Sequence, residues 1–151
     1  MDDMIAKSTV IVRAKVGAPK TALHGSIVYT HYTVYVAEQL KGASSSQMDV
    51  VVPGGRIGRI AQTFSGTPAL VEGTEYVLFL WTGRSGLTHV IGLTQGVFHV
   101  NRNAQGQVVL SRTASTEPML DPSTGREVAD QAVSLRWSEL ARRVKELTSK
   151  E

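Results

Sequence analysis

The apolar pattern of the chain is most distinctive in the run EYVLFLW at residues 75–81. A strand with one face in water alternates apolar and polar residues, because successive side chains point to opposite faces. Here both faces are apolar, with Tyr76, Leu78 and Leu80 on one and Val77, Phe79 and Trp81 on the other. The short length, the β-favouring composition and the nearby glycines favour a strand over a buried helix. We therefore predict a strand that is covered on both sides.

Two segments that precede this run alternate as half-buried strands do. Residues 9–16 place Arg13 and Lys15 on the face opposite to that of their valines. Residues 27–40 form the longest predicted strand, and strands of this length in small proteins are usually bent or bulged. Its two faces carry Val28, Thr30, Tyr32, Val34 and Val36, and Tyr29, His31, Thr33 and Tyr35. Residues 17–26 are predicted to be a polar connection, too long for a tight hairpin turn.

Shorter strands are predicted elsewhere along the chain. They span residues 48–52, a piece near 60–64, and residues 87–91, 97–101, 107–112 and 132–135. A Pro-Gly-Gly turn at 53–55 ends the first of them, and 97–101 pairs with 107–112 as a hairpin. Residues 113–131 are polar and carry turn signals, which predicts a long loop.

Helices are predicted at the two ends of the chain. Residues 2–7 form a short helix, and a longer one starts near Ser138, which is a suitable N-cap. In the longer helix Leu140, Val144 and Leu147 follow the spacing of a buried stripe. We expect this stripe to cover one face of strand 75–81, and the valines of the first two strands to cover the other.

These elements predict one domain over residues 1–151, with a mainly β fold. We expect a small closed or partly open OB-like β-barrel, with a packed C-terminal helix and a short N-terminal helix. A chain of 151 residues with 42% hydrophobic residues is long enough for one core. The absence of cysteine excludes disulfides, a thiol nucleophile and thiolate metal ligands. No apolar run approaches the length of a membrane span.

No catalytic or metal-binding motif is found in the sequence. The serines lack the strand-turn-helix setting of a nucleophile elbow, and the acidic residues suggest no pair for acid–base chemistry. The glycine-rich residues 52–58 lack the Lys-Ser/Thr ending of a phosphate-binding loop. The histidines form no close helical pair, and no carboxylate stands beside them at ligand spacing; they are His24, His31, His89 and His99. We therefore predict a protein that is not an enzyme and has no metal site or cofactor.

The best candidate for a binding surface is the outward row on strand 27–40. It comprises Tyr29, His31 and Tyr35, with Arg13 and Lys15 on the neighbouring strand. OB-type barrels bind oligonucleotides or oligosaccharides on such faces, through aromatic stacking and cations. The alternative is a solvated barrel face with strand-favouring tyrosines.

The order of four segments resembles the netrin-like family, which includes the tissue inhibitors of metalloproteinases. The segments are residues 10–16, 32–42, 50–53 and 72–80, roughly the first half of the chain. The resemblance implies an OB-type barrel flanked by terminal helices. Animal members are disulfide-bonded and inhibit proteases through an N-terminal cysteine, so that activity does not carry over to a chain without cysteine.

The chain is also similar to exported bacterial proteins without an assigned activity, which carry the pattern of residues 81–87 and 90–93. We therefore expect a non-enzymatic binding or protein-interaction module of an exported bacterial protein, with an unknown protein partner. The alternative is an oligonucleotide- or glycan-binding domain that uses the face of Tyr29, His31 and Tyr35. We expect a leader peptide upstream of Met1 and a secreted or periplasmic location, with a cytoplasmic one as the alternative.

Overall fold

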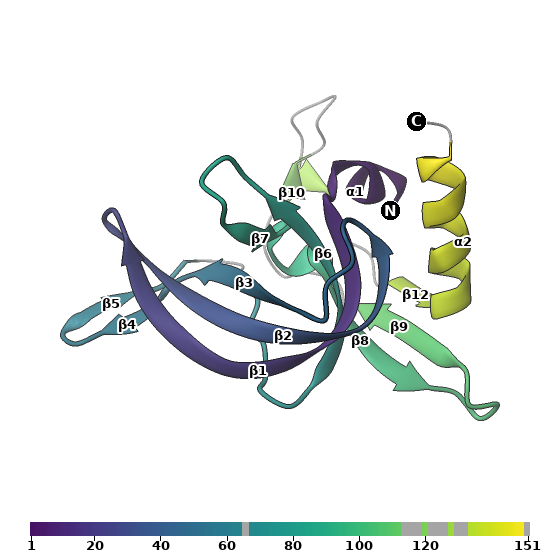
Figure 1. The fold of residues 1–151 in the computed structure, drawn as a ribbon, viewed down its shortest axis with the longest axis horizontal. Helices are drawn as coiled ribbons and strands as arrows, with labels where there is room; N and C mark the ends of the chain where they lie inside the picture. The colour runs from purple at the N-terminus through teal and green to yellow at the C-terminus, as the bar shows by residue number, and fades with distance from the viewer. Residues whose placement is uncertain (65–66, 113–118, 121–126, 129–132, 150–151) are drawn as a thin grey trace.

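A barrel-like ring of strands forms the body of the molecule (Figure 1). The computed structural model describes residues 1–64, 67–112, 119–120, 127–128 and 133–149. Within them, five strands neighbour one another in the order β1 (Val10–His24), β2 (Ile27–Lys41), β3 (Gln47–Pro53), β7 (Thr88–Val90) and β6 (Glu75–Thr82), and β6 pairs back onto β1. The β3–β7 pairing is parallel and the others in the ring are antiparallel. This ring confirms the predicted OB-like barrel.

A second group of strands extends the sheet away from the ring. After the 3-10 turn η1 (Leu93–Gly96), β8 (Val97–Arg102) pairs with β6 beside β7, and β9 (Val108–Arg112) and β12 (Val133–Arg136) follow. Helices α1 (Asp2–Lys7) and α2 (Trp137–Thr148) lie side by side next to this extension (Figure 1). Among the described residues, neither helix has the length and apolar character that crossing a bilayer requires. The shorter predicted strands are thus found as β3, β5, β7, β8, β9 and β12.

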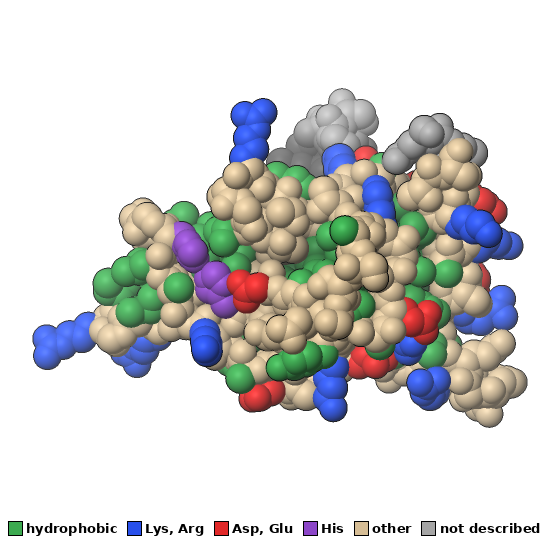
Figure 2. Space-filling model, viewed as in Figure 1, with side chains coloured by type: hydrophobic (Ala, Val, Ile, Leu, Met, Phe, Trp, Pro, Cys, Tyr) green, Lys and Arg blue, Asp and Glu red, His purple; other side chains and the backbone are tan. Residues whose placement is uncertain are grey.

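Two small hairpins complete the described elements. The hairpin of β4 (Gly55–Ile57) and β5 (Ile60–Gln62) lies against the tip of the β1–β2 hairpin, where Gln62 accepts a hydrogen bond from the Val28 amide and donates one to the Ser26 carbonyl. Apolar side chains gather on the outer surface at this end (Figure 2). The pair β10 (Met119–Leu120) and β11 (Glu127–Val128) lies within the predicted loop 113–131, whose other residues are outside the described part.

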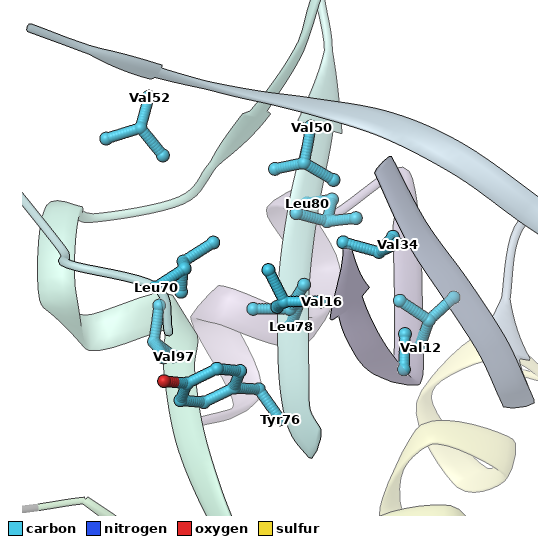
Figure 3. Close-up of a cluster of buried hydrophobic side chains, with 11 residues drawn as sticks. Val12, Val16, Val34, Val50, Val52, Leu70, Tyr76, Leu78, Leu80 and Val97 are labelled. Carbon is cyan, nitrogen blue, oxygen red and sulfur yellow. The ribbon is translucent and has the colours of Figure 1, made fainter. Parts of the chain in front are cut away.

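Strand β6 is buried on both faces, as predicted. Tyr76, Leu78 and Leu80 point into the barrel, where they meet valines of β1, β2 and β3 (Figure 3). This inner cluster comprises Val12, Ala14, Val16, Val34, Val50, Val52, Leu70, Tyr76, Leu78, Leu80 and Val97. On the outer face, Val77 and Phe79 contact the helices and the sheet extension. This outer cluster comprises Met4, Ile5, Ile11, Val77, Phe79, Phe98, Leu110, Trp137, Leu140 and Val144.

The predicted connection at residues 17–26 is wrong, because strand β1 continues through it to His24. The register of β1 against β2 shifts between Val16 and Pro19, and this bulge bends both strands around the barrel. Gly17 fits there because a Cβ would lie 2.8 Å from the Thr33 carbonyl oxygen. The chain then reverses at Gly25, whose φ of 65° suits a tight turn. Most residues of this part of β1 are at least partly exposed, so its sequence lacks the apolar alternation of a half-buried strand.

The C-terminal helix begins one residue before the predicted N-cap. Its N-cap is Arg136, whose side chain donates to Glu139 at 2.9 Å, so Ser138 lies inside the helix. The Trp137 indole donates to Glu38 at 3.0 Å. The guanidinium of Arg13 lies over the Trp137 ring, 5.4 Å from its centre. These contacts hold the start of α2 against strands β1 and β2.

Burial of β6 on both faces makes Phe79 a sensitive site for stability. We expect Phe79→Ala to lower the free energy of unfolding by about 3–5 kcal/mol, because it removes a fully buried ring and leaves a cavity. The matched change Phe64→Ala removes a ring that is 40% exposed and should cost about 1 kcal/mol or less. Urea unfolding followed by circular dichroism compares the two, and equal losses would contradict this packing.

Candidate ligand-binding face

Aromatic and imidazole rings form a continuous strip across the outer face of the barrel. We call Trp81, His89, Tyr29, His24 and His31 the aromatic strip. Adjacent ring centres lie 5.7 Å apart for Trp81–His89, 5.9 Å for His89–Tyr29, 5.4 Å for Tyr29–His24 and 5.0 Å for His24–His31. The Tyr29 contacts are edge-on, which is a favourable arrangement for aromatic pairs. The strip therefore connects β6, β7, β2 and β1.

The strand register explains why these rings meet. Trp81 pairs with His89, His89 with Val51, Val51 with His31, and His31 with Lys20. Paired residues on neighbouring strands point to the same face of a sheet, so this row crosses five strands on the outside of the barrel. Val51 is only 1% exposed. A buried valine in the middle of an outer face shows that the surrounding side chains cover the sheet there.

Hydrogen bonds orient the histidine end of the strip. The Nδ1 atom of His31 lies 2.6 Å from a carboxylate oxygen of Asp49 on β3. Its Nε2 atom lies 2.8 Å from the Nε2 atom of His24. Both ring nitrogens of His31 are thus engaged, which fixes the position of the ring. Figure 2 shows this end as histidine side chains beside an acidic one.

A shallow hollow adjoins the tryptophan end of the strip. Its volume is about 540 Å3, and it is lined by Lys7, Trp81, His89, Val90, Ile91 and Gly92. The Trp81 side chain is 47% exposed, although the preceding residues of β6 are buried. An exposed indole beside a mainly apolar hollow offers a planar surface and a recess to a ligand.

Lysines flank the strip at both ends. Lys20 lies next to His31 on β1, and Lys7 lines the hollow beside Trp81. Lys7 also pairs with Asp3 at 3.1 Å, but both side chains are largely exposed, so this ion pair contributes little to stability. Lys7 can therefore leave Asp3 to contact a ligand. Burial lowers the pKa of His89, which keeps its ring neutral at neutral pH. The centre of the strip is therefore neutral, with cations at its ends.

The structure brings together only some of the residues that were predicted to form the binding surface. Tyr29 and His31 lie in the strip. Tyr35 is 53% exposed but lies four residues beyond His31 along β2, about 13 Å away, beside Lys15. Arg13 is not available as a surface cation: its side chain is 11% exposed and forms ion pairs with Glu38 and Glu75.

Three members of the strip were not predicted from the sequence. His24 lay in the segment that was expected to be a loop, and His89 in a strand whose neighbours were unknown. Trp81 was assigned to the buried strand. The sequence does not reveal that the terminal helices leave this residue uncovered. The polar residues that follow it, Thr82 and Arg84, are the one sequence signal that the buried part of the strand ends near Trp81.

Comparisons with known proteins identify no relative. A scan against protein-family models, a search of curated proteins and a search of solved structures each found no match to the chain. The functional interpretation therefore depends on the geometry of the strip.

The lowered pKa of His89 can be measured directly. We expect its imidazole to titrate below the ordinary value of about 6.5 in a histidine NMR titration. The unfolded chain then binds more protons than the folded one below pH of about 6.5, so stability falls as the pH drops from there to the folded pKa. Trp81→Ala uncovers the ring and should move this pKa back upward. A His89 midpoint at or above the ordinary value would contradict the burial of this ring.

Proposed function

We propose that the chain is a non-enzymatic binding module whose ligand, a single-stranded oligonucleotide, lies along the aromatic strip. The observation that carries this proposal is the unbroken contact of rings from Trp81 to His31 across the outer face of the barrel. OB-type barrels use this part of the sheet, and the loops beside it, to bind oligonucleotides and oligosaccharides.

Stacking supplies the main attraction in this proposal. Bases present a planar face whatever their sequence, and an aromatic side chain stacked on one contributes about 1–3 kcal/mol. Trp81 offers the largest exposed ring and Tyr29 lies in the middle of the strip. An oligonucleotide that runs from the hollow towards the β1–β2 tip would pass over both Trp81 and Tyr29.

The charge around the strip favours a polyanion over a neutral glycan. Lys7 and Lys20 stand at the two ends, and the chain carries a formal net charge of +3. The carboxylate nearest to the strip, Asp49, is engaged by His31 at 2.6 Å. Lysines beside stacking rings bind phosphates along the backbone, and such binding weakens steeply as salt is added.

Fluorescence anisotropy with a labelled oligothymidylate at low salt tests this function. We expect saturable, salt-sensitive binding that Trp81→Ala and Tyr29→Ala each weaken by about 1–3 kcal/mol, because each loses a stacked base. Tyr35→Ala is the matched control: it removes an exposed tyrosine of the same strand that lies outside the strip, and should change affinity little.

The outcomes separate the alternatives. No binding at low salt would exclude the oligonucleotide. Salt-insensitive binding of neutral glycans that the same two variants abolish would assign the strip to sugars instead. Equal losses in Tyr29→Ala and Tyr35→Ala would show that the strip does not hold the ligand.

A second candidate function is binding of a protein partner through the hairpin tips. Leu23, Ile27 and Ile60 remain at least 36% exposed where the β1–β2 and β4–β5 hairpins meet. Exposed aliphatic side chains gathered at one end are typical of an interaction surface. This surface borders the strip at Ile27 and is otherwise separate from it.

Cross-linking capture tests the protein partner. We expect Ile60→Ser to weaken a captured interaction by about 1–2 kcal/mol, because it places a hydroxyl at the apolar contact. Val71→Ser is the control, since Val71 is 59% exposed and lies outside the hairpins. A partner that is retained by the first variant and lost by the second would place the interface elsewhere.

The netrin-like relationship and export from a bacterial cell are further proposals. Both rest on the resemblance of sequence segments, and the barrel with two terminal helices is compatible with the first. The gene sequence upstream of Met1 tests export, because a secretory leader there would support it and an unrelated cytoplasmic domain would argue against it.

A further inference from the structure

We propose that His24 and His31 form a binding site for one divalent transition metal ion, copper(II) or nickel(II) by preference. The site lies at the histidine end of the aromatic strip, on the outer face of the β1–β2 hairpin. His24 and His31 also belong to the aromatic strip, but the metal site uses their ring nitrogens, whereas base stacking is tested at Trp81 and Tyr29. The two proposals can therefore fail separately.

The distance between the two histidines suits a shared metal ion. Their Nε2 atoms lie 2.8 Å apart and share a hydrogen bond. Imidazole nitrogens bind such metals at about 2.0–2.1 Å, so two neighbouring ligands are about 2.9 Å apart at a right angle and about 3.3 Å apart in a tetrahedron. The hydrogen bond holds the two nitrogens near the separation of a right-angled pair, and a turn of the His24 ring would direct its lone pair at an ion bound to Nε2 of His31. Copper(II) and nickel(II) prefer such right-angled nitrogen ligands.

Asp49 prepares His31 to act as a ligand. Nδ1 of His31 donates a hydrogen bond to the Asp49 carboxylate over 2.6 Å. The Nε2 atom of His31 therefore carries the lone pair, and it lies on the side of His24. Metal-binding histidines almost always donate their other N–H to a carboxylate, a carbonyl or a water, which fixes the ring and raises its basicity. The carboxylate also lies close enough to offset part of the charge of a bound cation.

His24 is held on the other side by packing and by the hairpin tip. Its ring meets the Tyr29 ring edge-on, with centres 5.4 Å apart. The turn that follows it is tied to β5, because Gln62 donates to the Ser26 carbonyl at 2.8 Å. Without a metal, the Nε2–H of His24 donates to His31; with one, that proton moves to Nδ1 of His24, and the neutral ring becomes a ligand.

The charged and ligating groups around this pair set its affinity. Lys20 pairs with His31 in the sheet register and opposes a cation, whereas Asp49 favours one. Among the described residues, no group of three or more histidines, cysteines or carboxylates gathers around one point. Water would therefore fill the remaining positions, and the site would bind copper(II) more tightly than nickel(II) or zinc(II).

Isothermal titration of the full chain with nickel(II) and copper(II) chloride, in a buffer that does not bind metals, tests the site. We expect one ion per chain. Because the second imidazole binds intramolecularly, His24→Ala or His31→Ala should weaken binding about 100-fold. Asp49→Asn should weaken it about 10–100-fold, because it removes the carboxylate that orients His31.

Control variants locate the binding and separate the two proposals. His99→Ala removes an exposed histidine on β8 and should leave metal affinity unchanged, whereas a loss there would overturn the site. Trp81→Ala removes a ring of the oligonucleotide surface and should also leave it unchanged. Folding of each variant is checked by circular dichroism, and the metal should raise the melting temperature of the parent chain but not of His24→Ala.

Two results would overturn the proposal. One is the absence of heat and of any change in the His24 and His31 NMR signals at millimolar metal. The other is binding of undiminished affinity in the double variant of His24 and His31, which would assign the ion to another part of the chain.

Discussion

Burial of strand β6 on both faces is the constraint on which the rest of the structure depends. Leu78 and Leu80 contribute to the inner cluster and Val77 and Phe79 to the outer cluster, and none of the four is exposed. Apolar burial of this extent is the dominant favourable term in folding a domain of this size. Because both faces need cover, the barrel must close on one side of β6 and the helices must dock on the other.

The position of the aromatic strip follows from where that cover ends. Helices α1 and α2 reach the outer face of β6 as far as Phe79, and the next outward residue, Trp81, is left partly exposed. On the adjoining strands the same outer face carries His89, Val51 and His31 in register. The open part of the barrel wall is thus the part that the two helices do not cover, and the candidate ligand surfaces are confined to it.

Charged residues on the covered side serve the fold. Arg13 bridges Glu38 and Glu75 and lies over Trp137, so it links strands β1, β2 and β6 to the start of α2. A guanidinium can satisfy two carboxylates and an aromatic face at once because of its planar shape and many donors. The outward face of β1 therefore divides in two: Arg13 belongs to the helix contact, and Lys20 to the exposed wall.

The sequence by itself determined which segments become strands and which side chains share a face. The alternation of apolar residues placed Val34 on the inner face of β2 and Tyr29 and His31 on the outer one, because side chains in a strand repeat every two residues. It also identified the buried stripe of α2 at Leu140 and Val144 and the double cover of β6. The mainly β barrel with terminal helices followed from these patterns.

Only the tertiary structure decided which strands are neighbours and where each is covered. Residues 17–24 carry no apolar alternation, because most of them are at least partly exposed, and their pairing comes from the bulged register with β2. His24 and His31 are 7 residues apart and His31 and Asp49 are 18 apart, and the registers of β1 with β2 and of β2 with β3 bring their nitrogens and carboxylate together. Local periodicity reports the environment of a strand's faces, whereas cross-strand contacts depend on register and ring closure, which are properties of the whole chain.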